Sequence, residues 1–245
     1  LERCDRVLAQ SEADVRRIAA AGAPAEAVAT AGNLKYDFEP GAAEPAADLA
    51  RTLAETKADP LLVAGSTREG EESPVAAAFA ELARARPRAL LIVAPRHPPR
   101  FDEAAAALAA AGLPVARRSR LPEGPLPLPG ILLLDSLGEL SSLYPRAAAV
   151  FVGGSLNGWG GHNVLEPALV GRPVVVGPWM QNFRDIADRL TAAGALLRVD
   201  DAAGLGRAWG ELLADPVRAR QIGERGRQAA DAERGAAARI ARAVA

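Results

Sequence analysis

The stretch AVFVGGSLNGWGGHNVLEPALVGRPVVVGP, residues 149–178, decides the fold class of this chain. A short apolar run stands at each end. Between them lies a glycine-rich loop with Asn157, His162 and Asn163, followed by a helical segment. Short buried strands that alternate with helices are typical of a parallel sheet covered on both faces. A plain connection between two such strands needs neither the asparagines nor the histidine, so the stretch also predicts a ligand-binding loop.

The same alternation extends from about residue 45 to the end of the chain. Helices are expected between the strands, and two Ala- and Arg-rich helices after the last strand. The strands are expected at residues 60–66, 88–96, 113–119, 131–136, 149–155, 173–178 and 195–200. The pattern predicts an α/β fold with a doubly wound, mostly parallel, Rossmann-like sheet and helices on both faces.

A shorter strand–helix–strand pattern precedes this one, and Ser11 is the expected N-cap of its helix. The stretch between Asp37 and Glu44 is rich in Pro, Gly and acidic residues, which is the composition of a linker. We therefore expect two parts, residues 1–40 and residues 41–245.

The composition argues against several classes of protein. The 29 Lys and Arg residues nearly balance the 30 Asp and Glu residues, so the net charge of -1 gives no reason to expect a nucleic-acid partner. A single cysteine excludes a disulfide framework. His97 and His162 lack a third ligand at a metal-site spacing, so neither a metal nor another cofactor is expected. The sequence has no apolar run of the roughly 20 residues that cross a bilayer.

Four loops rich in polar residues follow predicted strands, and they begin after Gly65, Ala94, Asp135 and Gly153. Because the carboxyl ends of parallel strands lie at the same edge of a sheet, we expect these loops to converge on one ligand site. A glycine-rich turn that leads into a helix suits a phosphate group, whose oxygens accept hydrogen bonds from free backbone N–H groups.

For several of these residues a structural role is the alternative to a functional one. Arg96 follows a buried strand, where its guanidinium could hold a phosphate or could be a solvated charge. Asn163 and Glu166 have the spacing of a capping box, which would make them a helix-start device. Glu139 also stands at an expected helix start, where it could favour the helix dipole or contact a base or sugar.

Seven segments, in order and spacing from about Leu1 to Leu190, resemble the 3-deoxy-D-manno-octulosonic acid (Kdo) transferases of lipopolysaccharide synthesis. The segments are RVLAQSEADVRRI, AGNLKYD, LLVAGSTREGEE, LLIVAPRHPPRF, DSLGELSSLY, FVGGSLNGWGGHNVLEPALVGRPVVVGP and NFRDIADRL. These enzymes are GT-B glycosyltransferases, in which two Rossmann-like domains enclose the active site. The resemblance implies that residues 1–40 end the N-terminal acceptor domain and that residues 41–245 form the C-terminal domain, which binds the donor CMP-Kdo. It also implies that the rest of the acceptor domain, with the catalytic base and a membrane-associating segment, precedes Leu1.

The resemblance also assigns residues to the donor site. Contacts with CMP are implied for three clusters: Pro95, Arg96, Leu137, Gly138, Glu139, Asn163, Val164, Leu165 and Glu166. A glutamate placed like Glu166 holds the ribose hydroxyls in GT-B enzymes. Secondary donor candidates are Lys35, Ser66, Thr67, Gly161 and His162. No catalytic residue is expected in this chain, and the segment SLNGWGG departs from the charged residues that more usually precede the paired glycines.

The implied reaction is the inverting transfer of Kdo from CMP-Kdo to a lipid A precursor, at the cytoplasmic face of the bacterial inner membrane. The present chain would carry the donor site and have little or no transfer activity by itself. One alternative is another GT-B enzyme or an epimerase that takes a UDP-sugar, which a preference for UMP over CMP would reveal. The other is a nucleotide-binding module without enzymatic activity, against which an upstream domain with an acidic base would argue.

Overall fold

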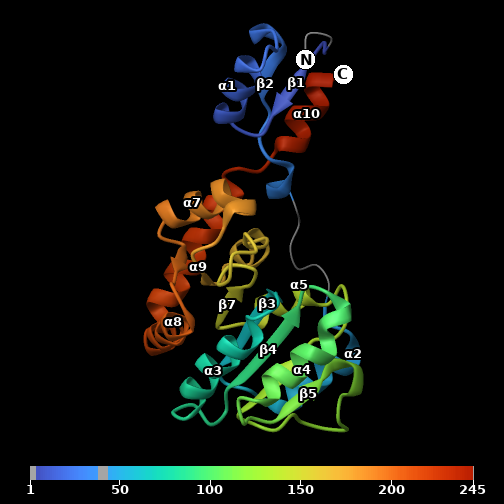
Figure 1. Cartoon of the computed structure of the whole chain (residues 1–245), viewed down its shortest axis with the longest axis vertical. Helices are drawn as coiled ribbons and strands as arrows, with labels where there is room; N and C mark the ends of the chain where they lie inside the picture. Colours follow the sequence, from blue (N-terminus) through green and yellow to red (C-terminus); the bar gives the residue numbers. More distant parts are fainter. Residues whose placement is uncertain (1–3, 38–43, 245) are drawn as a thin grey trace. The chain divides into compact units, whose positions relative to one another are not determined.

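The structure is a computed structural model that describes residues 4–37 and 44–244, and the chain divides into two compact units (Figure 1). One unit combines Leu1–Glu39 with Gln228–Ala245, and the other consists of Pro40–Arg227. The boundary between the units falls between Glu39 and Pro40, and residues 228–245 group with the first unit and not with the second. Most of the expected linker lies outside the described residues.

In the first unit, strands β1 (Val7–Ala9) and β2 (Val28–Thr30) pair in parallel. They are joined through helix α1 (Glu12–Ala20) and the short helix η1 (Ala25–Ala27). The Ser11 hydroxyl accepts a hydrogen bond from the backbone N–H of Asp14 at 3.2 Å, which confirms the predicted N-cap. The short helix η2 (Leu34–Asp37) follows β2, and helix α10 (Ala236–Val244) packs against it.

The start of α10 is fastened by Asp37, whose carboxylate accepts hydrogen bonds from the backbone N–H groups of Gly235 and Ala237, the latter at 2.6 Å. These two donors hold the pKa of Asp37 below its usual value. The stabilising effect is therefore present at neutral pH and is lost as the pH falls through the lowered pKa.

We expect the Asp37→Ala variant to lose this cap and to fray the first turn of α10. Hydrogen exchange of the α10 backbone amides measures this directly, with Glu26→Ala, an exposed change on η1, as the control. Equal amide protection in the two variants would show that Asp37 does not hold the helix.

In the second unit, seven strands form one parallel sheet in the order β5-β6-β4-β3-β7-β8-β9. The chain starts in the middle at β3, moves to one side through β4, β5 and β6, and then crosses to β7 on the other side of β3. The strands are β3 (Leu61–Thr67), β4 (Leu90–Pro95), β5 (Val115–Arg117), β6 (Gly130–Leu133), β7 (Ala149–Val152), β8 (Val174–Val176) and β9 (Leu196–Arg198). This is the predicted doubly wound α/β sheet, and its order reverses between β3 and β7.

The helices of this unit alternate with the strands, as the sequence predicts. They are α2 (Ala47–Thr56), α3 (Glu72–Ala83), α4 (Phe101–Ala109), α5 (Leu140–Leu143), α6 (Leu165–Leu169), α7 (Arg184–Ala192) and α8 (Ala202–Ala214). Helix α9 (Pro216–Asp231) runs from this unit into the first. Helix α2 is not among the predicted helices, and the structure has three helices after the last strand, α8, α9 and α10, where the sequence predicts two.

Both faces of the sheet are buried. On one face, alternate strand residues such as Leu62, Leu91 and Phe151 pack with Phe79 of α3 and Trp209 of α8 in one core cluster. The residues of opposite parity are also buried, among them Val63, Ile92 and Val150. On that second face α5 and η5 (Tyr144–Arg146) lie against β3. The approach is close, since a Cβ on Gly65 would stand 2.6 Å from the Tyr144 hydroxyl. Burial on both faces of the sheet therefore explains why the strands are apolar almost throughout, as the sequence predicts.

The carboxyl end of β3 is irregular. Its register with β4 shifts between Gly65 and Thr67, and Ser66 between them has a φ of 57°, in the left-handed region that side chains other than glycine rarely adopt. The first residue after β7, Gly153, lies directly on this bulge. A Cβ at Gly153 would stand 2.6 Å from both the Ser66 carbonyl oxygen and the Thr67 Cα, so only glycine fits.

Candidate functional site

The polar loops that the sequence singles out lie at one edge of the seven-stranded sheet. Since all the strands are parallel, the loops after β3, β4, β6 and β7 emerge at its carboxyl edge. The loops after β3 and β7 flank the point where the strand order reverses, which is where open α/β sheets bind their ligands. Backbone hydrogen bonds tie three of them together: Arg96 N–H to Thr67 carbonyl at 2.9 Å, and Gly153 N–H to Gly65 carbonyl at 2.8 Å.

Glu71, which is not among the residues predicted from the sequence, organises the loops on either side of the reversal point. Its side chain is 0% exposed. Its two carboxylate oxygens accept hydrogen bonds from four backbone N–H groups, at distances of 2.6–2.9 Å. The donors are Arg68 in its own loop and Gly154, Ser155 and Leu156 in the loop after β7. Burial raises the pKa of Glu71, while the N–H donors act in the opposite direction.

The neighbouring Glu72, also buried, connects the β3 end to the loop after β4. Its carboxylate accepts the Thr67 hydroxyl at 2.9 Å and both terminal nitrogens of Arg100 at 3.1 Å. This paired arrangement raises the pKa of the Arg100 guanidinium, which stays charged at physiological pH. Two adjacent glutamates thus fix one loop each, Glu71 the loop after β7 and Glu72 the loop after β4.

The segment SLNGWGG is folded back onto the loop after β8. The Gly161 N–H donates to the Gly154 carbonyl at 2.7 Å, and the Asn182 side-chain amide donates to the Trp159 carbonyl at 3.0 Å. Gly161 has a φ of 75°, and a Cβ there would stand 2.3 Å from the Met180 sulfur. The glycines therefore serve a close approach between two loops, which is one physical reason for their number.

Positive charge gathers beside these loops. The Arg68 guanidinium lies 4.0 Å from the centre of the Trp159 ring, and it also contacts Nε2 of His97. Arg68 and Arg96 both act electrostatically on His97 and on His162. Nε2 of His162 is buried and has no hydrogen-bond partner. The cluster therefore offers donors and positive charge but accepts little, which is what an anionic ligand needs.

Burial, reinforced by Arg96, Arg68 and His97, lowers the pKa of His162 to about 4. We therefore expect His162 to stay neutral throughout the physiological range. The chain has two histidines, so a nitrogen-15 NMR titration of the ring resonances resolves each one. Because the pKa falls on folding, His162 weakens the fold progressively as the pH drops from about 6.5 towards 4. A His162 midpoint near 6.5 would contradict this burial.

The predicted capping box at Asn163 and Glu166 is not formed as expected. The Asn163 side-chain oxygen accepts the Leu165 N–H at 3.1 Å, and its amide nitrogen donates to the Glu166 carboxylate at 3.2 Å. The helix itself begins at Leu165, with Val164 as its N-cap residue. Glu166 therefore holds the Asn163 side chain instead of the backbone, and burial raises the pKa of its half-buried carboxyl.

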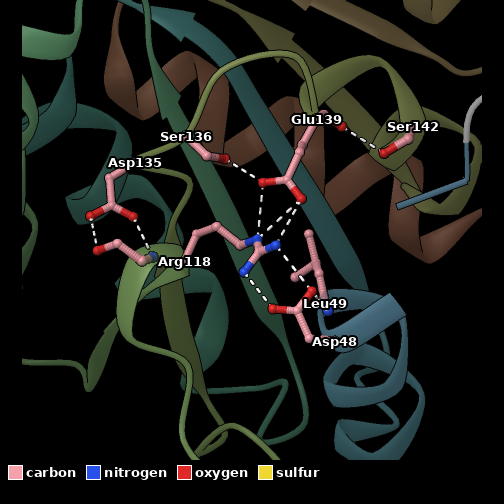
Figure 2. Close-up of polar contacts among 8 residues, drawn as sticks. Asp48, Leu49, Arg118, Asp135, Ser136, Glu139 and Ser142 are labelled. Carbon is pink, nitrogen blue, oxygen red and sulfur yellow. Dashed lines mark hydrogen bonds and ion pairs between the residues drawn. The ribbon is translucent and has the colours of Figure 1, made fainter. Parts of the chain in front are cut away.

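Glu139 is already engaged in a polar network (Figure 2). Its carboxylate accepts from Arg118, with Nε at 2.9 Å, and from the Ser136 hydroxyl. Arg118 also binds Asp48 at the start of α2, at 2.9 Å, and so fastens α2 to the loop after β6. In contrast, Leu137 is 71% exposed and a Cβ on Gly138, whose φ is 85°, would meet nothing within 4 Å. At this loop the backbone and Leu137 are open to a ligand, whereas the Glu139 carboxylate is paired.

The remaining candidates divide between the units. Pro95, Val164 and Leu165 are buried at the same sheet edge, as is Thr67, and Ser66 is half-buried there. Lys35 lies in η2 of the first unit and is exposed. Among residues 4–37 and 44–244 no group of three or more His, Cys, Asp or Glu side chains could hold a metal ion, and no described helix is long and apolar enough to cross a membrane.

No protein-family model matches this sequence. Among curated proteins, the chain is 43% identical over 241 residues to the 3-deoxy-D-manno-octulosonic acid transferase of Bordetella pertussis, covering 96% of this chain and 55% of the relative. The 3-deoxy-D-manno-octulosonic acid transferase of Haemophilus influenzae is 35% identical, and the match again covers 96% of this chain and 55% of the relative. The chain thus spans about half the length of the curated relatives it matches.

A solved structure, the C-terminal CMP-Kdo binding domain of WaaA from Acinetobacter baumannii, is 32% identical with a TM-score of 0.67. The match covers 74% of this chain and 95% of that domain. The chain belongs to the Kdo transferase family. The chain also shares the GT-B fold with Anabaena HepE, solved with UDP-glucose, at a TM-score of 0.57 but 15% identity, a likeness that concerns the fold alone.

Proposed function

We propose that the carboxyl edge of the seven-stranded sheet is the CMP-Kdo site of a Kdo transferase. The observation that supports the proposal is that Arg96, Leu137–Gly138 and Glu166 all follow carboxyl ends of strands in one parallel sheet, whose order reverses between β3 and β7. The similarity to the CMP-Kdo binding domain of Acinetobacter baumannii WaaA supports CMP-Kdo as the donor. In this proposal residues 41–227 form the donor domain and residues 1–40 the end of the acceptor domain.

Each cluster has a part of the donor to bind. Glu166 accepts hydrogen bonds from the ribose hydroxyls, for which its carboxylate must turn from Asn163. The exposed backbone at Leu137, Gly138 and Glu139 faces the cytosine. The α5 and α6 helices have only 4 and 5 residues, so their dipoles contribute little, and Arg96 carries most of the favourable interaction with the phosphate.

The proposed reaction joins an acceptor hydroxyl to the anomeric carbon of Kdo, with inversion. The bond between that carbon and the phosphate oxygen breaks, and its electron pair leaves with CMP, where Arg96 stabilises the growing charge. A general base takes the proton of the hydroxyl, and we assign that role to no residue of this chain. In the complete enzyme the acceptor is a lipid A precursor, presented at the cytoplasmic face of the inner membrane.

Calorimetric titration of this chain with CMP and with UMP tests the donor site. We expect CMP to bind more tightly, and the Glu166→Ala variant to lose at least about tenfold in affinity, because it loses hydrogen bonds to a charged group. Glu55→Ala, an exposed change on α2, is the matched control and should bind like the unchanged chain. Tighter binding of UMP would favour a UDP-sugar enzyme instead, and a folded chain that binds neither nucleotide would contradict the proposal.

A further inference from the structure

The proposed donor carries two anionic groups close together. In CMP-Kdo, the anomeric carbon of the sugar acid bears both the phosphate ester and the carboxylate. A site for this donor therefore needs charged N–H donors at two adjacent places, whereas a site for a nucleotide linked to a neutral sugar needs them only at the phosphate.

Two arginines are available at the carboxyl edge. Arg96 follows β4, and Arg68 follows the bulge of β3, where its backbone N–H is fixed by Glu71. Within residues 44–244 neither guanidinium forms an ion pair with a carboxylate. The Trp159 ring supports one face of the Arg68 guanidinium, an arrangement that leaves N–H groups in its plane for a ligand.

His162 lies at the same place. A Cβ built on Gly154 would stand 3.1 Å from the orphaned Nε2 of His162 and 3.4 Å from Cγ of Arg68, so both side chains converge on this glycine. Gly154 also has a φ of 68°, so both its backbone conformation and the close contacts favour glycine there. A buried imidazole nitrogen without a hydrogen-bond partner costs free energy. In His162 this nitrogen lies near the side-chain stem of Arg68, whose guanidinium pairs with no carboxylate among the described residues.

We propose that Arg68 and His162 form the subsite for the carboxylate of the Kdo residue, with Arg96 facing the phosphate. This inference rests on the proposed function and names the part of the donor that these side chains recognise. Arg68 donates to the carboxylate, His162 donates through Nε2, and His97 positions Arg68 through their contact. The pair discriminates donors with a sugar acid from donors with a neutral sugar.

The test compares three ligands by calorimetry: CMP, a non-hydrolysable phosphonate analogue of CMP-Kdo, and the same analogue with a hydroxymethyl group in place of the carboxylate. For Arg68→Gln we expect the carboxylate analogue to bind about ten- to a hundredfold more weakly, because a charge-assisted hydrogen bond is lost. CMP and the hydroxymethyl analogue should bind within about twofold of their affinity for the unchanged chain, a difference that lies within the scatter of a surface substitution. Arg84→Gln, at the exposed C-cap residue of α3, is the matched control for charge.

A spectroscopic readout addresses His162 in the unchanged chain. A carboxylate bound between Arg68 and His162 stabilises the protonated ring, so His162 should titrate at a higher pH with the carboxylate analogue than with the hydroxymethyl analogue. The His97→Gln variant assigns the two ring signals.

If Arg68→Gln weakens the affinity for all three ligands equally, Arg68 contacts the phosphate and the proposed subsite is wrong. The proposal is also wrong if the variant binds all three ligands as tightly as the unchanged chain. An unchanged His162 titration would remove His162 from it. Failure of CMP itself to bind the unchanged chain is a different result, which contradicts the donor site as a whole.

Discussion

The Glu71→Ala variant is expected to lose about 3 kcal/mol or more of the free energy of unfolding, and to lose nucleotide binding with it. The substitution leaves four backbone N–H groups without their acceptor, three of them at Gly154, Ser155 and Leu156, and each buried unsatisfied donor costs roughly 1–3 kcal/mol. Water that enters the vacated space recovers part of this cost. Urea denaturation and CMP titration measure the two effects.

Two further variants sharpen this prediction. Glu69→Ala removes an exposed carboxylate from the same loop and should leave both stability and binding nearly unchanged. Glu71→Gln keeps the shape but presents an amide N–H₂ to N–H donors, so it should restore only part of the stability. A Glu71→Ala chain as stable as Glu69→Ala would mean that the loop after β7 is held by its other contacts.

The second large effect is expected for Arg100→Met, with a loss of about 3 kcal/mol, at the low end of the range for breaking a buried ion pair. Glu72 is 2% exposed and Arg100 15% exposed, so the change leaves a buried carboxylate with the Thr67 hydroxyl as its remaining donor among those described here. Thermal or urea unfolding measures the loss.

A double-mutant cycle separates the pair from simple loss of packing. Adding Glu72→Met to Arg100→Met should recover most of the stability, because two apolar side chains then replace the two charges. Arg84→Met, which breaks an exposed pair with Glu81, should cost no more than about 0.5 kcal/mol. Additive losses in the cycle would show that Arg100 and Glu72 do not depend on each other.

The strands of the second unit, and the sheet edge at which the polar loops emerge, follow from the sequence alone. Each apolar run is short, rich in β-branched residues and bounded by polar loops, and a parallel sheet is the arrangement that buries such runs on both faces. Helix α2 was missed because its apolar stripe has little besides Leu49 and Leu53, in an Ala-rich segment beside the expected linker. Periodicity is weak where so few large side chains carry it.

Contacts between distant segments account for the other differences. Glu71 is bound to residues 83 to 85 positions away, and Asp37 caps a helix that begins about 200 positions later. No local pattern encodes such pairings. Asn163 and Glu166 have the spacing of a capping box, yet the helix begins after Val164, and the same two side chains bond to each other. Spacing alone does not fix which partner a polar side chain takes.

The most direct test of the donor site is to map CMP binding by backbone amide NMR. We predict that titration with CMP perturbs the amides of Arg96, Gly138 and Glu166 most strongly, at the carboxyl ends of β4 and β6 and in α6. The amides around the cavity of about 480 Å³ between α3 and α8, lined by Ala78, Leu82 and Gly206 among others, should be unaffected. Perturbation concentrated at that cavity, with the carboxyl-edge amides unchanged, would contradict the placement of the donor site.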